Sequence, residues 1–420
     1  MISLRDILEG SGGVLHGNAH PDLLLRHIRH DSREVEPGDL FVAIVGERHD
    51  GHDFVSDALA RGARAVMVDR QHAPSLEELS VPVIVVDDTT AGLQRLASYW
   101  RSLFDVRVVG ITGSIGKTST KEAVASVASQ RYQVVRTRLS YNTDIGVSLA
   151  LLEITPDTEV VVLELGEAYR LNEVRELCQL GRPSIGVVTN VSYSHLGRMG
   201  TLEAIAESIA ELPESLPDDG VAVLNGDDFR VRAMAERCRC PVVLYGLAPD
   251  CDARAEAIES HGLAGISFDL ILDGQRSRVR LPLLGRHSVH TALAAIATGR
   301  ALDMTLDEIL PGFSDPTVQV RLLTVPGING STILDDTYNA NPTSCLAALS
   351  LLAEIPAKRR IAVFGDMYEL GWYEAEGHRL VGRRAATVVD RLFTLGPRAR
   401  LIAAEAVSGG LPAIAVVATE

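Results

Sequence analysis

The chain has 420 residues, which is enough for about three domains of ordinary size, each with its own core. Its formal net charge of −15 argues against nonspecific binding to nucleic acids or anionic membranes, because both need a basic protein surface. No apolar run approaches the ~20 residues that a membrane-spanning helix needs, and the N-terminus lacks a signal-peptide core. Five cysteines without a disulfide framework are typical of a reducing compartment, so we expect a cytoplasmic protein.

Residues 1–90 are predicted to form a small α/β domain. Three short apolar runs separated by turn residues predict strands, at 39–45, 65–68 and 81–86. The stretch 54–62 predicts a helix between the first two strands, and a second helix over 89–104 leads out of the domain.

A glycine-rich loop opens the next domain. The apolar run 106–109 predicts a buried strand, the segment Gly110-Ile-Thr-Gly-Ser-Ile-Gly-Lys-Thr-Ser119 follows it, and 118–130 predicts a helix. The N-terminus of a helix offers free N–H groups to phosphate, and an ammonium can enter such a cradle beside a polyphosphate. Lys117 is one of only three lysines among forty basic residues. We therefore predict a nucleotide-phosphate site formed by Gly113, Ser114, Gly116, Lys117, Thr118 and Ser119.

The Thr118 hydroxyl is placed to ligate Mg²⁺ in such a loop. One departure is that Ile111 occupies the place of the usual first glycine, with Gly110 one residue earlier. The alternative is a glycine-rich turn with a solvated lysine.

Residues 91–312 are predicted to form a mostly parallel sheet with helices on both faces. Buried-strand runs alternate with helical stretches, at 160–163, 185–188, 221–224 and 242–244. The runs 266–272 and 277–283 read as an antiparallel hairpin that ends the sheet, 290–303 predicts a helix, and 311–316 resembles a linker.

Two polar side chains follow strands of this sheet on the side where ligands of such folds collect. Glu164 ends the run 160–163, and His195 follows the strand 185–188. A carboxylate and an imidazole could complete a magnesium shell there. Imidazole is unusual for Mg²⁺, so a loop hydrogen bond remains the alternative for His195.

Residues 313–420 are predicted to form a third α/β domain, with strands at 331–334, 361–364 and 392–395. The segment Asp335-Asp-Thr-Tyr-Asn-Ala-Asn-Pro342 lies between a strand and a helix, where its acids and amides suit ribose hydroxyls or amino and carboxylate groups. The alternative is an Asx-rich helix cap. Arg321 could reach phosphate from this domain, although a lone arginine is more often on the surface.

The chain resembles the Mur ligases, the ATP-dependent amide-forming enzymes of peptidoglycan precursor synthesis. The resemblance runs from about residue 25 to about 400. It rests on the order and spacing of several blocks: Asp31-Ser-Arg33, Pro37-Gly-Asp-Leu-Phe41, Asp50-Gly-His52, Gly110 to Thr120, Asn142-Thr-Asp-Ile-Gly146, Glu164-Leu-Gly166, Thr189-Asn190 with His195, Gly285-Arg-His287, Asp335 to Pro342, and Gly365 to Gly371.

The resemblance implies a role for each matching residue. Residues 1–90 would bind the UDP end of a UDP-N-acetylmuramoyl-peptide, 91–312 would bind ATP, and 313–420 would complete the ligase site. Sugar-nucleotide and peptide contacts would come from Ser32, Arg33, Asn142, Tyr338, Asn339 and Asn341. Arg321 and Asp335 would close over the nucleotide, and Thr118, Glu164 and His195 would serve Mg²⁺, with Lys117, Glu164 and His195 as the catalytic set.

The implied reaction needs no protein nucleophile. A substrate carboxylate attacks the γ-phosphate of ATP, and an amine displaces phosphate from the acyl phosphate. The 335–342 pattern favours D-alanyl-D-alanine as the amine and a UDP-N-acetylmuramoyl-tripeptide as the carboxylate, handled by a monomer. Another amino-acid acceptor, or a weakly active nucleotide-binding homologue, is the alternative.

Three departures from the family pattern stand out. Ile209 occupies the place of a lysine that the family carbamylates to hold a second magnesium ion, and Glu207 or Glu211 would have to supply that charge. Ser288 and Thr291 replace paired asparagines near the adenine. The chain stops at Glu420, before the family's last strands, so we expect a shortened third domain with an exposed sheet edge.

Overall fold

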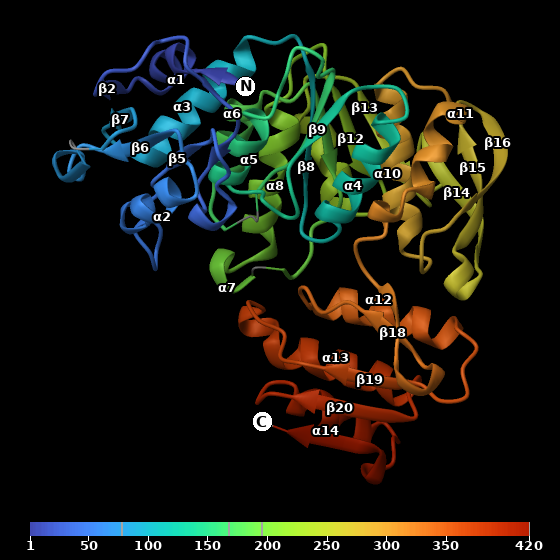
Figure 1. The fold of residues 1–420 in the computed structure, drawn as a ribbon. Helices are drawn as coiled ribbons and strands as arrows, with labels where there is room; N and C mark the ends of the chain where they lie inside the picture. Colours follow the sequence, from blue (N-terminus) through green and yellow to red (C-terminus); the bar gives the residue numbers. More distant parts are fainter. Residues whose placement is uncertain (77–78, 167–168, 195, 420) are drawn as a thin grey trace. The chain divides into compact units, whose positions relative to one another are not determined.

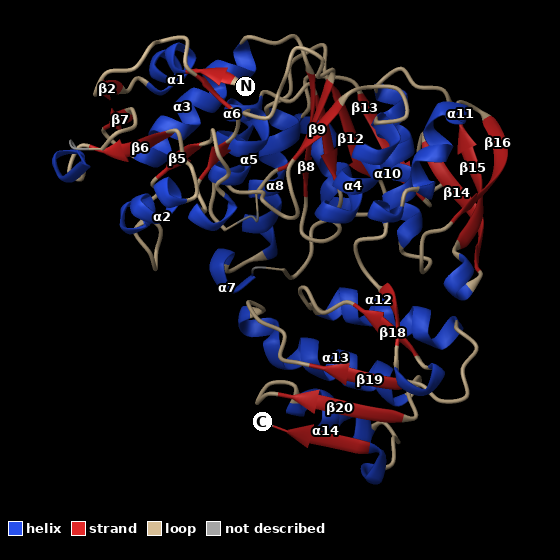
Figure 2. Ribbon diagram, in the orientation of Figure 1, coloured by secondary structure: helices blue, strands red, loops and turns tan. Residues whose placement is uncertain are grey.

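The computed structural model describes residues 1–76, 79–166, 169–194 and 196–419. The chain divides into two compact units. The first comprises Met1–Val109, Tyr132–Leu165 and Glu176–Pro183, and the second comprises Gly110–Arg131, Gly166–Arg175 and Ser184–Glu420. Helices and strands alternate along the chain, which confirms the predicted α/β class (Figure 2).

A five-stranded sheet occupies the N-terminal part of the first unit. Its order is β2 (Val14–His16), β7 (Val83–Val86), β6 (Ala65–Asp69), β5 (Leu40–Val42), β4 (Ile28–Arg29), and only β2 runs antiparallel to its neighbour. The three predicted apolar runs are β5, β6 and β7. Smaller elements complete this part: the antiparallel pair β1 (Ile2–Ser3) and β3 (Leu24–Leu25), and the helices α1 (Leu4–Ser11), α2 (Val55–Ala60) and α3 (Thr89–Ser102).

The largest sheet has nine strands. Their order is β16 (Gln275–Leu281), β15 (Ile266–Leu272), β14 (Ala253–Ser260), β13 (Val242–Gly246), β12 (Val221–Asn225), β11 (Ile185–Val188), β8 (Arg107–Thr112), β10 (Val160–Glu164) and β9 (Val134–Arg136). The pairs from β11 to β14 are parallel, whereas β14, β15 and β16 are antiparallel. The predicted hairpin is β15 and β16, and β16 ends the sheet as expected. Strands β9 and β14 were not predicted.

Helices join these strands, as Figure 1 shows along the chain. They are α4 (Lys117–Ala128), α5 (Asp144–Leu151), α6 (Glu173–Gly181), α7 (Leu196–Met199), α8 (Leu202–Glu214), α9 (Phe229–Ala233), α10 (Ser288–Ala301) and α11 (Leu306–Ile309). The predicted linker 311–316 is instead folded into two short 3₁₀ helices, η6 (Leu310–Ser314) and η7 (Pro316–Val318). Ser126 of α4 donates a hydrogen bond to the Gly312 carbonyl at 2.7 Å, so this segment packs on the helix that follows the glycine loop.

The C-terminal part of the second unit has its own core. It contains the antiparallel pair β17 (Leu323–Pro326) and β18 (Thr332–Asp335), the parallel sheet β19 (Ile361–Phe364), β20 (Arg391–Leu395) and β21 (Val416–Thr419), and the helices α12 (Pro342–Glu354), α13 (Glu374–Ala386) and α14 (Arg400–Ser408). Ala362 of β19 and Leu392 of β20 are buried in this core. Val363 and Leu395 point the other way and are 73% and 56% exposed.

Candidate functional site

The glycine loop runs from β8 into α4, as predicted. Gly116 caps the helix with a φ of 83°, a conformation that suits glycine, and Lys117 begins the first turn. The Lys117 ammonium donates to the Gly113 carbonyl at 2.9 Å, and the side chain is only 6% exposed. The first N–H groups of a helix have no acceptor inside it, so the start of α4 presents donors beside a buried ammonium. This arrangement fits a polyphosphate.

The loop is held by the segment that follows β11. The Ser114 and Ile115 N–H groups donate to the backbone and side-chain oxygens of Asn190, at 2.8 and 3.1 Å. A Cβ on Gly113 would lie 2.0 Å from the Thr189 hydroxyl oxygen, so only glycine fits at that contact. Sequence reasoning did not give Asn190 a role in the site. Its place directly after a buried strand was the available signal.

Thr118 lies on the first turn of α4, directly after Lys117, and is partly exposed, a position compatible with a cation beside the phosphate donors. His195, the predicted imidazole ligand, lies outside the described residues.

Glu164 and Asn142 form a buried pair in the first unit. The Asn142 side-chain amide donates to Glu164 Oε1 at 3.0 Å, and the Glu164 N–H donates to the Thr137 hydroxyl at 3.1 Å. Glu164 is 1% exposed, and Asn142 directly precedes Thr143, the N-cap of α5. A carboxylate this deeply buried needs hydrogen bonds or a cation to remain charged. The sequence indicated a metal role for Glu164 and a substrate role for Asn142, and the structure brings the two into direct contact.

The predicted sugar-nucleotide residues lie in a short 3₁₀ helix, η1 (Ser32–Glu34). Ser32 is buried, whereas the Arg33 guanidinium is exposed and pairs with Asp31 at 2.6 Å. The hydrogen bonds from Arg33 lower the pKa of Asp31 to about 2. The Asp31–Arg33 pair therefore keeps a guanidinium at the surface, where an anionic group can approach it.

Arg321 lies against the segment 335–342 in the second unit. Its guanidinium carbon is 4.5 Å from the centre of the Tyr338 ring. Burial raises the pKa of Asp336, and the nearby positive charge of Arg321 opposes that shift. Arg321 Nη1 and Asp336 Oδ1 are both buried without a hydrogen-bond partner. Buried polar atoms in this state are ready to bind a polar ligand or a water molecule.

Of the neighbouring predicted residues, two form local turn or cap hydrogen bonds and two are exposed. Asp335 accepts hydrogen bonds from the Thr337 N–H and hydroxyl, at 3.0 and 2.7 Å, so it forms a local turn. Tyr338 and Asn339 are exposed. Asn341 caps α12 by accepting from the Ser344 N–H at 2.9 Å, which matches the helix-cap alternative for this residue. Asp336, which sequence reasoning did not single out, is half-buried and is the acid whose Oδ1 atom is fully buried.

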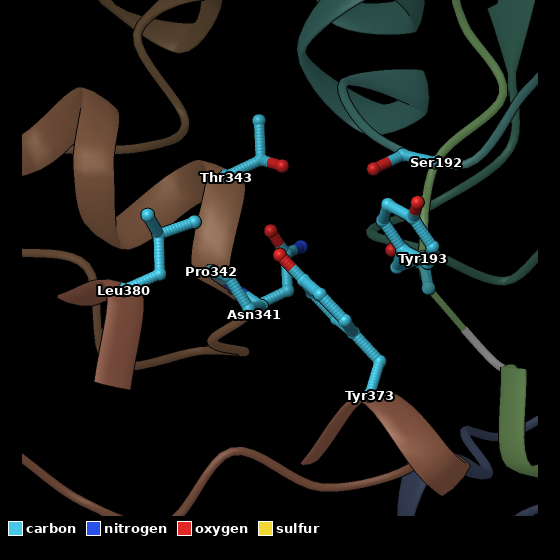
Figure 3. Close-up of a pocket in the computed structure, with 8 residues that line it drawn as sticks. Ser192, Tyr193, Asn341, Pro342, Thr343, Tyr373 and Leu380 are labelled. Carbon is cyan, nitrogen blue, oxygen red and sulfur yellow. The ribbon is translucent and has the colours of Figure 1, made fainter. Parts of the chain in front are cut away.

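Asn341 also lines a pocket in the second unit (Figure 3). The remaining lining residues follow β11 or lie on or near α12 and α13: Ser192, Tyr193, Ser194, Pro342, Thr343, Tyr373 and Leu380. The Tyr193 and Tyr373 rings stack with their centres 4.2 Å apart. Hydroxyl and amide groups beside two aromatic rings form a surface that suits a small peptide. Sequence reasoning missed both tyrosines, since neither lies in a recognisable motif.

The family's carbamylated lysine has no substitute among the described residues of α8. Ile209 is fully buried. Glu211 accepts from the Asn172 and Arg175 N–H groups, at 2.6 and 3.0 Å, and Glu207 pairs with Arg237 at 2.8 Å. Both acids are thus committed to structural contacts. These contacts argue against either acid replacing the carbamate, and the replacement stays an untested prediction.

Three family models match the chain: the Mur ligase family catalytic domain over residues 25–101, the Mur ligase middle domain over 111–299, and the glutamate ligase domain of Mur ligases over 320–420. A UDP-N-acetylmuramoyl-tripeptide--D-alanyl-D-alanine ligase from Synechocystis is 37% identical over 393 residues, covering 93% of this chain and 84% of that protein. The chain belongs to the Mur ligase family.

Other similar proteins carry the same name. The Escherichia coli ligase is 36% identical to this Mur ligase, and the alignment covers 95% of this chain and 86% of that protein. A crystal structure of MurF from Acinetobacter baumannii superposes with a TM-score of 0.86 at 30% identity, covering 100% of this chain and 89% of that one. The structure of MurF from Thermotoga maritima, solved in complex with ADP, superposes with a TM-score of 0.80 at 28% identity. The superposition covers 96% of this chain and 90% of that one. Among the described residues, no helix is long and apolar enough to cross a membrane.

Proposed function

We propose that this Mur ligase joins D-alanyl-D-alanine to UDP-N-acetylmuramoyl-tripeptide at the expense of ATP. The observation that carries the proposal is the buried Lys117 ammonium at the start of α4, in a chain similar over nearly its whole length to ligases of that name. Residues 1–90 hold the sugar nucleotide through Ser32 and Arg33, residues 91–312 hold ATP, and residues 313–420 hold the dipeptide.

The chain's residues act by position and charge. The loop N–H groups and Lys117 hold the ATP phosphates in line with the tripeptide carboxylate, whose oxygen attacks the γ-phosphorus while ADP leaves. The dipeptide amine then attacks the acyl carbon, and phosphate departs. Bound Mg²⁺ neutralises phosphate charge in this chemistry, and Thr118, Glu164 and His195 are the residues proposed to hold it.

The third part of the chain supplies the acceptor contacts. Arg321 and Asp335 are proposed to contact the nucleotide, and Tyr338, Asn339 and Asn341 the dipeptide. Asn341 is well suited to this role, because its capped helix start fixes the side chain at the pocket of Figure 3. We further propose that the enzyme acts in the cytoplasm as a monomer, which sedimentation of the purified chain would test.

Phosphate release tests the reaction. The chain is incubated with ATP, Mg²⁺, the tripeptide precursor and D-alanyl-D-alanine, and phosphate should appear only when all four are present. Release that does not depend on the dipeptide would contradict the proposal. Replacing the dipeptide by single amino acids or glutamate tests the alternative acceptors, and a faster rate with any of them would reassign the substrate.

Ile209 favours a second candidate, a nucleotide-binding homologue with little or no turnover. Tight ATP binding without product under all acceptor conditions would support it. Measurable turnover that disappears in Lys117→Ala would reject it.

A further inference from the structure

A cluster of two histidines and two aspartates lies in the N-terminal sheet domain, on elements to which the proposed reaction gives no role. Asp50 precedes the 3₁₀ helix η2 (Gly51–Phe54), which contains His52. Asp69 ends β6, and His72 follows it in the next turn. The two imidazole rings stack with their centres 3.8 Å apart and an interplanar angle of 12°.

The hydrogen bonds assign a proton position to His52. The Asp69 N–H can only donate, and it donates to His52 Nε2 at 3.1 Å, so that nitrogen is an acceptor. The proton of His52 is therefore on Nδ1, which donates to Asp50 Oδ1 at 2.6 Å. The His52 N–H donates to the same oxygen at 2.9 Å. His52 thus fixes Asp50 through Oδ1, and the second oxygen, Oδ2, faces the other histidine.

His72 is oriented by a carboxylate in the same way. Its Nδ1 lies 2.8 Å from Asp69 Oδ1, which also accepts from the Gln71 and His72 N–H groups. An imidazole that donates Nδ1–H to a carboxylate presents Nε2 as a ligand, and this outer hydrogen bond is typical of histidines that bind metals. The Nε2 atom faces Asp50 Oδ2 at 3.6 Å.

That separation suits two ligands of one tetrahedral cation. Metal–ligand bonds of about 2.0–2.2 Å at a tetrahedral angle place neighbouring ligand atoms roughly 3.4 Å apart. A ligand atom of His52 also lies within 4.8 Å of those of Asp50 and His72. The burial of His52 and the partial burial of Asp50 and Asp69 reduce competition from bulk water.

We propose that Asp50 and His72 bind one borderline divalent cation, with Zn²⁺ as the best-matched ion, and that His52 and Asp69 position the two ligands. Water completes the coordination shell. One imidazole and one carboxylate favour Zn²⁺ over Mg²⁺, which prefers oxygen ligands. The cation joins the segment after β5 to the turn after β6, so its binding stabilises the folded N-terminal sheet.

Zinc binding to the full chain tests the site. Equilibrium dialysis at pH 7.5, with excess Mg²⁺ to occupy oxygen-ligand sites, should give a saturable zinc equivalent that His72→Ala removes. His20→Ala is the matched control, because exposed His20 and Asp22 form an ordinary surface pair with the same 3.6 Å separation. This control should bind zinc like the wild type.

Thermal unfolding supplies the second readout. Zinc should raise the unfolding temperature of the wild type and of His20→Ala by several degrees but leave His72→Ala unchanged. His72→Gln replaces the alanine variant if the latter does not fold. Equal zinc binding by wild type and His72→Ala would overturn the proposal. Absence of saturable zinc binding, with His72 doubly protonated in NMR spectra at the same pH, would also overturn it and leave an imidazolium–carboxylate pair.

Discussion

At the scale of single residues, Lys117 is the side chain on which the phosphate loop depends most. Its ammonium is buried and donates to the Gly113 carbonyl. The loop contains no other lysine. We expect Lys117→Ala to lower the rate of dipeptide-dependent phosphate release at least 100-fold, because a preorganised charge beside the transferred phosphoryl group is lost. Lys358→Ala, which removes an exposed lysine, is the control and should keep the wild-type rate. A loss of less than threefold in Lys117→Ala would contradict the assignment.

Asp31 gives a pH-dependent prediction. Hydrogen bonds from Arg33 lower its pKa to about 2 in the folded chain, so the folded state binds this proton more weakly than the unfolded state. The pair therefore stabilises the fold above about pH 4 and loses that effect as the pH falls towards 2. Urea unfolding of wild type and Arg33→Ala should differ more at pH 5 than at pH 2.5. A difference that grows at low pH would contradict the assignment.

Site residues that belong to a local motif could be predicted, and those that depend on tertiary contacts could not. Lys117 and Thr118 follow from one loop whose spacing along the chain sets its geometry. Glu164 follows from its place at the end of an apolar run. Tyr193 and Tyr373 are 180 positions apart in the numbering, and no local pattern indicates that their rings stack.

At the scale of elements, the contact between η6 and α4 leaves no room for an added side chain at Gly312. A Cβ on Gly312 would lie 2.6 Å from the Val127 Cα and 2.9 Å from its nitrogen, and backbone atoms cannot move aside easily. We expect Gly312→Ala to lower the free energy of unfolding by about 1–3 kcal/mol. Denaturant titration measures this change. Gly46→Ala is the control, because a Cβ at Gly46 would approach no atom more closely than the His49 carbonyl oxygen at 3.4 Å, an ordinary contact distance. Equal denaturant concentrations at the unfolding midpoint of the two variants would contradict the prediction.

The same contact explains why the segment predicted as a linker is folded into short helices. Pro311, Gly312 and Pro316 indicate an interruption of regular secondary structure, and no long helix crosses them. The contact with α4 then folds the segment into 3₁₀ turns. Strand β14 was missed for a related reason. Its charged residues Arg254 and Glu256 hide the alternation of a strand, and they are accommodated because they pair with each other at 3.2 Å.

At the scale of the whole molecule, the C-terminal sheet presents apolar side chains to solvent. Val363 and Leu395 are exposed on the face opposite to the core residues Ala362 and Leu392. Parallel sheets are usually covered on both faces, and exposed apolar patches favour association. We expect Val363→Thr to change the unfolding free energy by less than about 0.5 kcal/mol while reducing self-association at high concentration. Denaturant titration and sedimentation would measure the two effects, and a loss of several kcal/mol would show that this face is covered.

The distribution of lysines has a practical consequence for the chemistry of the surface. Lys117 and Lys121 are buried, at 6% and 0% exposure, so Lys358 is the one lysine whose amine meets bulk solvent. Amine-selective reagents should therefore acylate the folded protein at Lys358 and the N-terminus alone. A dye or a surface tether attached at Lys358 would mark the C-terminal part of the chain at a known position, and ATP analogues with acylating groups would report on Lys117 with Lys358 as the one competing surface lysine.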